Sequence, residues 1–199
     1  MVILYEVHNG LYVNMTNKCP CRCTFCLRNK KNEMNGSGSL WLEHEPTVDE
    51  VVKEFEKFDM SKYQEVVFCG FGEPTERLYD VLDVAEFVKN TYSLPTRINT
   101  NGLSDLIWNK NTAPDYSGKI DVVSISLNTP NKARYYELTR NKFGVEAFDA
   151  MLKFAENVSK YVKKTVLTTV STIITTEEEK ACAAICKRLG VTYRIRPLE

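Results

Sequence analysis

The sequence has no excess charge of either sign, because its 199 residues hold 26 Lys and Arg against 26 Asp and Glu. Without a general basic field, the charge does not indicate nucleic acid as a partner, although a local basic patch stays open. No run approaches the roughly twenty apolar residues that a membrane span needs. Residues 1–6 lack the basic start and long apolar core of a signal peptide. We therefore expect a cytoplasmic protein with no membrane partner.

The sequence also lacks the spread, even-numbered cysteines of a secreted disulfide framework. Its seven cysteines are an odd number, and four of them lie within residues 19–26. A chain of this length can form one domain with a substantial core and needs no disulfide bonds. Clustered thiols in such a chain favour metal or redox chemistry.

Cys19, Cys23 and Cys26 have the spacing C-x3-C-x2-C, which lets one tight loop present three sulfurs to one inorganic cluster. A [4Fe–4S] cluster usually takes four protein thiolates, so three would leave one iron free to bind something else. Three alternatives stay open. A zinc site could combine the thiolates with His8 or His44, Cys23 and Cys26 could form a dithiol redox pair, or the clustering is accidental.

This spacing, with Phe25 as an aromatic residue before the last cysteine and a predicted strand before the first, resembles the radical SAM superfamily. The resemblance implies that Cys19, Cys23 and Cys26 hold a [4Fe–4S] cluster whose open iron chelates S-adenosylmethionine. In that superfamily an electron from the cluster cleaves the sulfonium, and the resulting 5′-deoxyadenosyl radical abstracts hydrogen from a substrate. An electron donor such as flavodoxin or ferredoxin is implied as a partner. Cys21 is interpreted as a non-ligand, because the family pattern is complete without it.

Predicted strands alternate with predicted helices along the chain. Strands are expected at residues 11–16, 65–69, 96–100, 120–127, 165–174 and 191–196, with a short lead-in strand within residues 1–9. Helices are expected after Thr47, where Glu50 completes a capping box, and at residues 78–90, 103–110, 131–138, 145–162 and 176–189. This order predicts an α/β fold with a parallel sheet. The resemblance implies a partial (β/α)6 TIM-like barrel, and we expect residues 1–199 to form a single radical SAM core domain.

Two turns at predicted strand ends resemble further motifs of the superfamily. Residues 70–74 read Gly-Phe-Gly-Glu-Pro and resemble the Gly-Gly-Glu-Pro motif, which implies that the turn and Glu73 hold the amine of S-adenosylmethionine. Residues 99–102 read Asn-Thr-Asn-Gly and resemble the Thr-Asn-Gly motif, with Asn99 where many relatives have an acidic residue. Each motif taken alone also fits an ordinary tight turn. Their order along the chain, after the cysteines, is the stronger argument.

Polar residues alternate along the fourth predicted strand, so that Ser124, Ser126 and Asn128 share one face. A polar face inside a barrel suits the ribose and carboxylate of the cofactor. Arg194 and Arg196 share a face of the last strand and could hold an anionic group, although solvation at a sheet edge explains them as well. The expected cofactor-binding residues are Phe25, Gly70, Phe71, Gly72, Glu73, Asn99, Thr100, Asn101, Ser124, Ser126, Asn128 and Arg196.

The remaining cysteines are expected to pack in the core. Cys182 and Cys186 lie four residues apart on one face of an apolar helix, and Cys69 follows an apolar strand. They therefore leave no cysteines for a second cluster. Residues 135–140 are expected to form a helix end at the surface, and a role as a substrate lid stays open.

Within the superfamily, residues 14–21, 27–29 and 194–199 most resemble the TatD-nuclease-associated radical SAM group. The substrate, a small molecule or a protein, is not identified by the sequence. Two alternatives are an activase that makes a glycyl radical on a partner protein and an enzyme similar to 7-carboxy-7-deazaguanine synthase. An alternative from another class is a zinc-binding adaptor without enzymatic activity.

Overall fold

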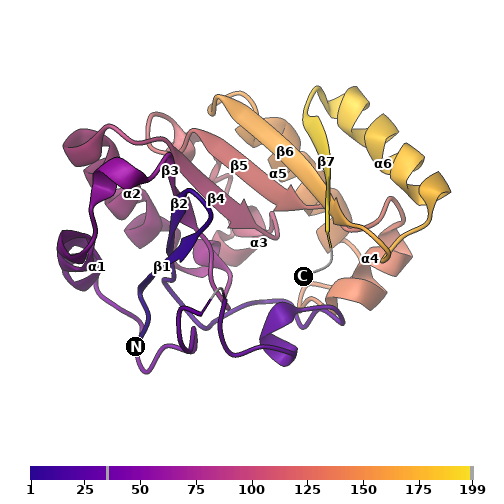
Figure 1. The fold of residues 1–199 in the computed structure, drawn as a ribbon. Coiled ribbons are helices and arrows are strands. Elements are labelled where there is room, and N and C mark those ends of the chain that lie inside the picture. Colours follow the sequence, from indigo (N-terminus) through magenta and orange to yellow (C-terminus); the bar gives the residue numbers. More distant parts are fainter. Residues whose placement is uncertain (35, 198–199) are drawn as a thin grey trace.

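A single curved sheet organises the structure, a computed structural model that describes residues 1–34 and 36–197 (Figure 1). The strands follow one another in space as β1 (Leu4–Val7), β2 (Gly10–Val13), β3 (Glu65–Phe68), β4 (Thr96–Thr100), β5 (Val122–Ser126), β6 (Lys164–Val170) and β7 (Thr192–Arg196). β1 pairs antiparallel with β2, and all later neighbours are parallel. The six parallel strands confirm the predicted α/β fold of a partial (β/α)6 barrel.

The helices lie behind and beside the sheet in Figure 1. They are α1 (Val48–Glu54), α2 (Leu78–Tyr92), α3 (Ser104–Trp108), α4 (Lys132–Thr139), α5 (Ala147–Val158) and α6 (Thr176–Leu189). Within the described residues, the edge strands β1 and β7 do not pair with each other, so the barrel is not closed. The segment that follows β2, indigo to purple in Figure 1, runs along the lower edge of the sheet, where β7 also ends.

Two capping boxes explain where helices begin. At the start of α1, Thr47 accepts a hydrogen bond from the backbone of Glu50, and the Glu50 carboxylate accepts one from the backbone of Thr47. This is the predicted box. Thr175 and Glu178 form the same pair before α6, and Gly190, with φ 69°, ends that helix. Both boxes satisfy backbone N–H groups that have no partner inside the helix.

Two strands end three or more residues earlier than predicted. β2 ends at Val13, and the side chain of the next residue, Asn14, donates to the carbonyls of Val2 and Leu40 at 3.2 and 2.8 Å. β6 ends at Val170, because Thr172 has a φ of 71°, which no strand residue adopts. The β-branched residues after Val170 favour a strand by propensity, but propensity does not predict the left-handed conformation of Thr172.

The two faces of the sheet have different character. Toward the helices, the fully buried side chains include those of Val66, Phe68, Ile98, Val123, Ile125 and Leu167. Successive strand residues point to opposite faces. The other face therefore carries the side chains that we call the polar sheet face, namely Tyr12, Arg97, Asn99, Ser124, Arg194 and Arg196.

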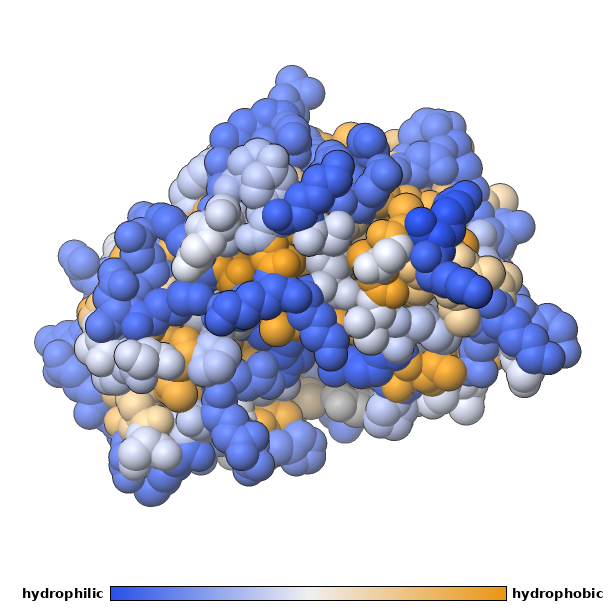
Figure 2. All heavy atoms as spheres, turned by 90° about the horizontal axis from the view of Figure 1, so that it is seen from above, coloured by the Kyte–Doolittle hydropathy of each residue, from blue (hydrophilic) through white to orange (hydrophobic). Residues whose placement is uncertain are grey.

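The outer surface is predominantly hydrophilic where Figure 2 shows it. Seen from above, hydrophobic residues form small separate groups between charged and polar ones. No helix in the described part of the chain is both long enough and apolar enough to cross a membrane.

Candidate metal and cofactor site

The cysteine loop, residues 19–26, lies at the carboxyl edge of the parallel strands, where α/β proteins place their chemistry. Cys19, Cys23 and Cys26 are partly exposed, whereas Cys21 is 2 % exposed. Asn101 donates to the Cys21 sulfur at 3.7 Å. The loop thus leaves the three cysteines of the C-x3-C-x2-C spacing partly exposed and buries the fourth.

The thiols of the loop lie close enough to affect one another's ionisation. Hydrogen bonds to Cys19 and Cys23 are the main reason why the pKa of Cys21 is raised. The same hydrogen bond from Cys21 lowers the pKa of Cys23, and burial opposes that effect. Burial raises the pKa of Cys26. Among the described residues, no three Cys, His, Asp or Glu side chains gather closely enough to hold a single metal ion.

The histidines are not placed to complete a zinc site with these thiols. His8 lies in the turn between β1 and β2, at the end of β2 opposite to the cysteine loop. His44 is 3.1 Å from the carboxylate of Glu50 at the start of α1. Both histidines are therefore accounted for by local structure.

Arg28, just after the cysteine loop, is a residue that the sequence analysis missed. Its guanidinium donates to the carbonyl of Phe71 at 3.3 Å and to that of Cys21 at 3.2 Å. It joins the cysteine loop to the Gly-Phe-Gly-Glu-Pro turn, two segments that are some fifty residues apart in the chain. An arginine two residues after the last cysteine was the available signal, but spacing does not show what a side chain contacts.

The glycine turn after β3 packs against the segment that enters the cysteine loop. A Cβ on Gly70 would lie 2.1 Å from Oδ1 of Asn14, and a Cβ on Gly72 would lie 2.1 Å from the carbonyl oxygen of Thr16. Only glycine permits these approaches. Phe71 is 7 % exposed, with its ring against Trp41. In this structure the close backbone approach serves the packing of two turns that flank the site.

Glu73 joins the two predicted motifs from within the core. Its carboxylate is 4 % exposed and accepts four hydrogen bonds. Two come from Thr75, through the backbone N–H at 3.2 Å and the hydroxyl at 2.7 Å. The Thr100 hydroxyl and the Asn101 backbone N–H donate the others, at 2.6 and 2.7 Å. The carboxylate that we expected at the cofactor amine is thus already occupied by protein donors.

The predicted residues at the ends of β5 and β7 include polar atoms without partners. Ser124 is 5 % exposed, and its hydroxyl accepts from Arg194 at 3.3 Å. Asn128 lies two residues beyond β5 with φ 64°. Within the part of the chain that the structure describes, its buried Oδ1 accepts no hydrogen bond and the buried Nε of Arg196 donates none. Ser126 is partly exposed. The carboxyl edge of the sheet therefore carries a buried hydrogen-bond acceptor just after β5 and a buried donor at the end of β7.

Other predicted residues already have protein contacts. Asn99 accepts from Arg97 at 3.0 Å and also hydrogen-bonds the thiol of Cys69, which is partly exposed rather than in the core as we expected. Phe25 is partly buried beside the cysteines. Cys182 and Cys186, at 0 % and 1 % exposed, pack in the core as predicted.

Comparison with known proteins agrees with this arrangement. The chain matches the family described as "Radical SAM superfamily" over residues 13–189. It is 27 % identical over 139 residues to Molybdenum cofactor biosynthesis protein 1 of Drosophila melanogaster, which is 68 % of this chain and 22 % of that protein. It is 28 % identical over 136 residues to GTP 3′,8-cyclase of Paenarthrobacter nicotinovorans, which is 66 % of this chain and 35 % of that protein. The matches span between 22 % and 46 % of the curated relatives.

A solved structure has a similar fold. The crystal structure of Streptococcus suis SuiB bound to S-adenosylmethionine superposes with a TM-score of 0.63 at 18 % identity, over 94 % of this chain and 38 % of that one. The family match extends from β2 to the end of α6 and so includes all cysteines of the loop and both turn motifs. The chain therefore belongs to the radical SAM superfamily, whose members use a [4Fe–4S] cluster and S-adenosylmethionine.

Proposed function

We propose that residues 1–199 form one radical SAM core domain in which Cys19, Cys23 and Cys26 hold the cluster. The observation that carries this proposal is the geometry of the cysteine loop. It leaves these three thiols partly exposed at the carboxyl edge of the parallel sheet and buries the fourth. The bound cluster and S-adenosylmethionine would supply a 5′-deoxyadenosyl radical for hydrogen abstraction.

The residues present fit this cofactor pair. Thiolates are the ligands that iron–sulfur clusters take. Each thiolate of a cubane binds a different iron, so the ligands need not converge as tightly as those of a single ion. The buried Oδ1 of Asn128 and Nε of Arg196 have no hydrogen-bond partner among the described residues. Buried polar groups are normally hydrogen-bonded. The hydroxyls, amine and carboxylate of S-adenosylmethionine offer the missing donor and acceptor.

Most of the predicted residues then have a role in or behind the binding site. The backbone of residues 70–72 faces the cofactor amine, and Glu73 orients that turn from behind through its hydrogen bonds to Thr100 and Asn101. Ser126 and Asn128 contact the ribose, and the guanidinium of Arg196 pairs with the carboxylate. Ser124 and Asn99 act through neighbours, because each is already bonded to an arginine.

Within the superfamily we place the chain in the TatD-nuclease-associated group. Residues 14–21, 27–29 and 194–199 support this assignment, and residues 198–199 lie outside the part of the chain that the structure describes. These residues include Arg28, which joins the cysteine loop to the glycine turn, and Arg196, which is part of the polar sheet face.

The polar sheet face favours a small anionic substrate over a protein substrate. Arg97 is neutralised by Glu65 through two hydrogen bonds of 3.0 and 2.6 Å. Arg194 has one hydrogen bond, to Ser124, and burial together with the charges of Arg97 and Arg196 lowers its pKa. Among the described residues, no carboxylate lies beside Arg194, and the proposed cofactor contacts do not supply one either. A phosphate or carboxylate group of a substrate would offset its repulsion from the neighbouring guanidinium groups. The curated relatives named GTP 3′,8-cyclase agree with a substrate of this kind.

The proposal is tested by anaerobic reconstitution of the protein with iron, sulfide and dithionite. Wild-type protein and the Cys21→Ala variant should bind about four irons per chain and cleave S-adenosylmethionine to 5′-deoxyadenosine. Cys19→Ala should lose the cluster absorbance and the product. A wild-type protein that takes up zinc in preference to iron, and gives no product, would contradict the proposal. Equal iron content in both variants would contradict the ligand assignment.

A further inference from the structure

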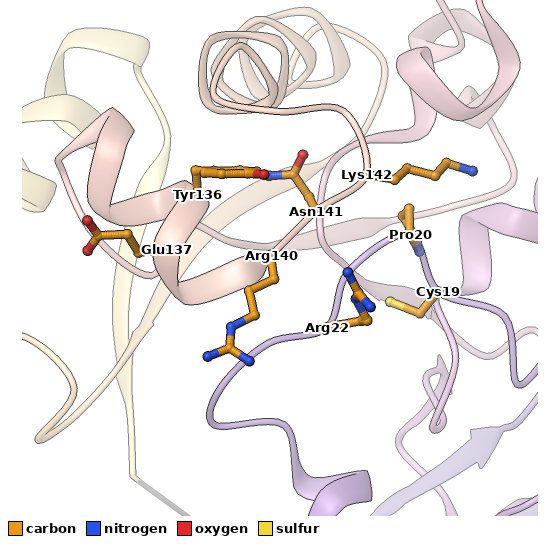
Figure 3. Close-up of a pocket in the computed structure, with 8 residues that line it drawn as sticks. All are labelled: Cys19, Pro20, Arg22, Tyr136, Glu137, Arg140, Asn141 and Lys142. Atoms are coloured by element: carbon orange, nitrogen blue, oxygen red, sulfur yellow. The ribbon is translucent and has the colours of Figure 1, made fainter.

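A hollow of about 720 Å³ lies directly beside Cys19 (Figure 3). One wall is the cysteine loop, and the other is the end of α4 with the turn that follows. The lining residues are Cys19, Pro20, Arg22, Tyr136, Glu137, Arg140, Asn141 and Lys142. None of the residues proposed to hold S-adenosylmethionine lines it. The hollow is therefore a separate feature that shares one proposed cluster ligand with the site.

Backbone hydrogen bonds fasten the two walls together. The N–H groups of Arg22 and Thr24 donate to carbonyls at the end of α4, at 2.9 and 3.0 Å, and the N–H of Lys142 donates to the carbonyl of Pro20 at 2.9 Å. Arg140 ends α4 in a left-handed conformation, with φ 46°. The shape of the hollow is thus set by main-chain contacts, and its charged side chains are free to meet a partner.

The hollow concentrates positive charge on a chain whose formal net charge is zero. Arg22, Arg140 and Lys142 are all exposed, and Glu137 is the only acidic residue in the lining. Among the described residues, no carboxylate pairs with either arginine within 4.0 Å, and the nearest to Lys142 is that of Glu76, at 3.9 Å. Tyr136, on the same wall, is 42 % exposed. Uncompensated cations around an exposed aromatic residue are typical of a surface that meets an acidic partner.

We propose that this basic hollow is the docking site of an acidic electron-transfer protein that reduces the cluster. The proposal rests on the proposed function, because the cluster is what receives the electron. The donor is oxidised by one electron, which the cluster accepts, and no bond forms or breaks. Docking here brings the donor against the loop that carries Cys19 and leaves the polar sheet face open to the substrate.

The exposure of the cations favours a protein over a small anion as the occupant. A pocket for a small ligand encloses it and places its polar groups within. Here all three cations are exposed at the surface, and of the lining residues only Pro20 and Asn141 are buried. The side chain of Asn141 donates a hydrogen bond to the hydroxyl of Thr139 and accepts one from the backbone N–H of Phe143. Charges arranged in this way steer an oppositely charged protein to one face.

The test uses the reconstituted protein with reduced flavodoxin as the probe. The variant carrying Arg140→Glu and Lys142→Glu is compared with a control that carries Lys180→Glu and Arg188→Glu. The control changes the net charge equally on the exposed face of α6, where neither residue has an ion pair among the described residues. The dissociation constant for flavodoxin is measured by calorimetry, and 5′-deoxyadenosine formation is measured with flavodoxin and, separately, with dithionite.

We expect the Arg140/Lys142 variant to bind flavodoxin at least about tenfold more weakly than the control. Its dithionite-driven activity should stay within about twofold of wild type, because dithionite does not dock. Wild-type affinity should fall as NaCl rises from about 50 to about 300 mM. Equal affinity in both variants, or binding that does not respond to salt, would overturn the proposal. A wild type inactive even with dithionite would instead refute the proposed function.

A milder variant keeps the test decisive if the double substitution disturbs folding. Arg140→Gln removes one charge and leaves the backbone contacts of the hollow in place. It should weaken flavodoxin binding about threefold, with an unchanged urea unfolding midpoint. Unchanged flavodoxin binding in this folded variant would count against the basic hollow as the docking site.

Discussion

Replacing Glu73 with Gln should destabilise the fold, even though the sequence motif associates this residue with cofactor binding. Oε1 of Glu73 accepts three of its four hydrogen bonds, from the backbone and hydroxyl of Thr75 and the hydroxyl of Thr100. Oε2 accepts the fourth, from the backbone N–H of Asn101 at 2.7 Å. Glutamine can keep its oxygen on the first side. Its amide N–H2 would then face the N–H of Asn101, donor against donor.

The expected loss of stability follows from the backbone N–H of Asn101, which would lose its acceptor. A buried donor that loses its acceptor costs about 1–3 kcal/mol, and hydrogen bonds to a charged group lie toward the upper end. We therefore expect Glu73→Gln to lower the free energy of unfolding by about 2–3 kcal/mol. With a urea m-value of about 2–3 kcal/mol/M for a chain of this size, the midpoint should fall by about 1 M.

The assay is urea unfolding of the protein without cluster or S-adenosylmethionine, followed by circular dichroism. Glu76→Gln is the matched control, because it is the same change in the short helix that Glu73 caps, and among the described residues its one ion pair, with Lys142, is 3.9 Å long. The control should shift the unfolding free energy by less than about 0.5 kcal/mol. If Glu73→Gln unfolds at the same urea concentration as wild type, the carboxylate does not hold the two turns together.

Two further predictions concern charge. Arg194→Gln should weaken the binding of GTP at least about tenfold if an anion occupies the polar sheet face, as measured by calorimetry, with Arg188→Gln as the control; equal affinities would contradict an anionic substrate there. Asp121 is 4 % exposed, and burial by itself would raise the pKa of its carboxyl group. Hydrogen bonds from Lys89, Lys163 and the Thr96 backbone outweigh burial and lower this pKa to about 2. The folded-state pKa lies below the ordinary 3.8, so this carboxylate should add about 2 kcal/mol to the free energy of unfolding above pH 4. That contribution should be lost as the pH falls toward about 2. Asp121→Asn should flatten the pH dependence of unfolding in that window, and an unchanged pH dependence would contradict the assignment.

Much of the architecture follows from local sequence patterns. Thr47 and Glu50 predict the start of α1, because a capping box is formed by residues three apart. The strand and helix alternation predicts the parallel sheet, because parallel strands need crossover connections. The spacing of Cys19, Cys23 and Cys26 predicts a loop that presents three thiols together. In the first and third of these cases the relevant residues are close in the chain.

The parts that could not be predicted depend on contacts between distant segments. Arg28 donates a hydrogen bond to the carbonyl of Phe71, which is 43 residues away in the chain. Gly72 packs against Thr16, which is also distant in the chain. Tertiary structure also decides that the carboxylate of Glu73 is hydrogen-bonded by protein groups, and that the Nε of Arg196 has no such bond among the described residues. A sequence pattern shows that a polar residue is present, but only the packed structure shows whether its hydrogen bonds are already made.

Cys21 is held inside the cysteine loop by contacts with other parts of the protein. Its side chain is 2 % exposed, Asn101 donates to its sulfur, and Arg28 donates to its carbonyl. It is thus held by both the Thr-Asn-Gly turn and the residue that joins the loop to the glycine turn. The thiol of Cys21 also forms hydrogen bonds with Cys19 and Cys23, so the buried cysteine contacts two of the three proposed ligands. These contacts account for Cys21 through the packing of the loop, in agreement with our proposal that the other three cysteines bind the cluster.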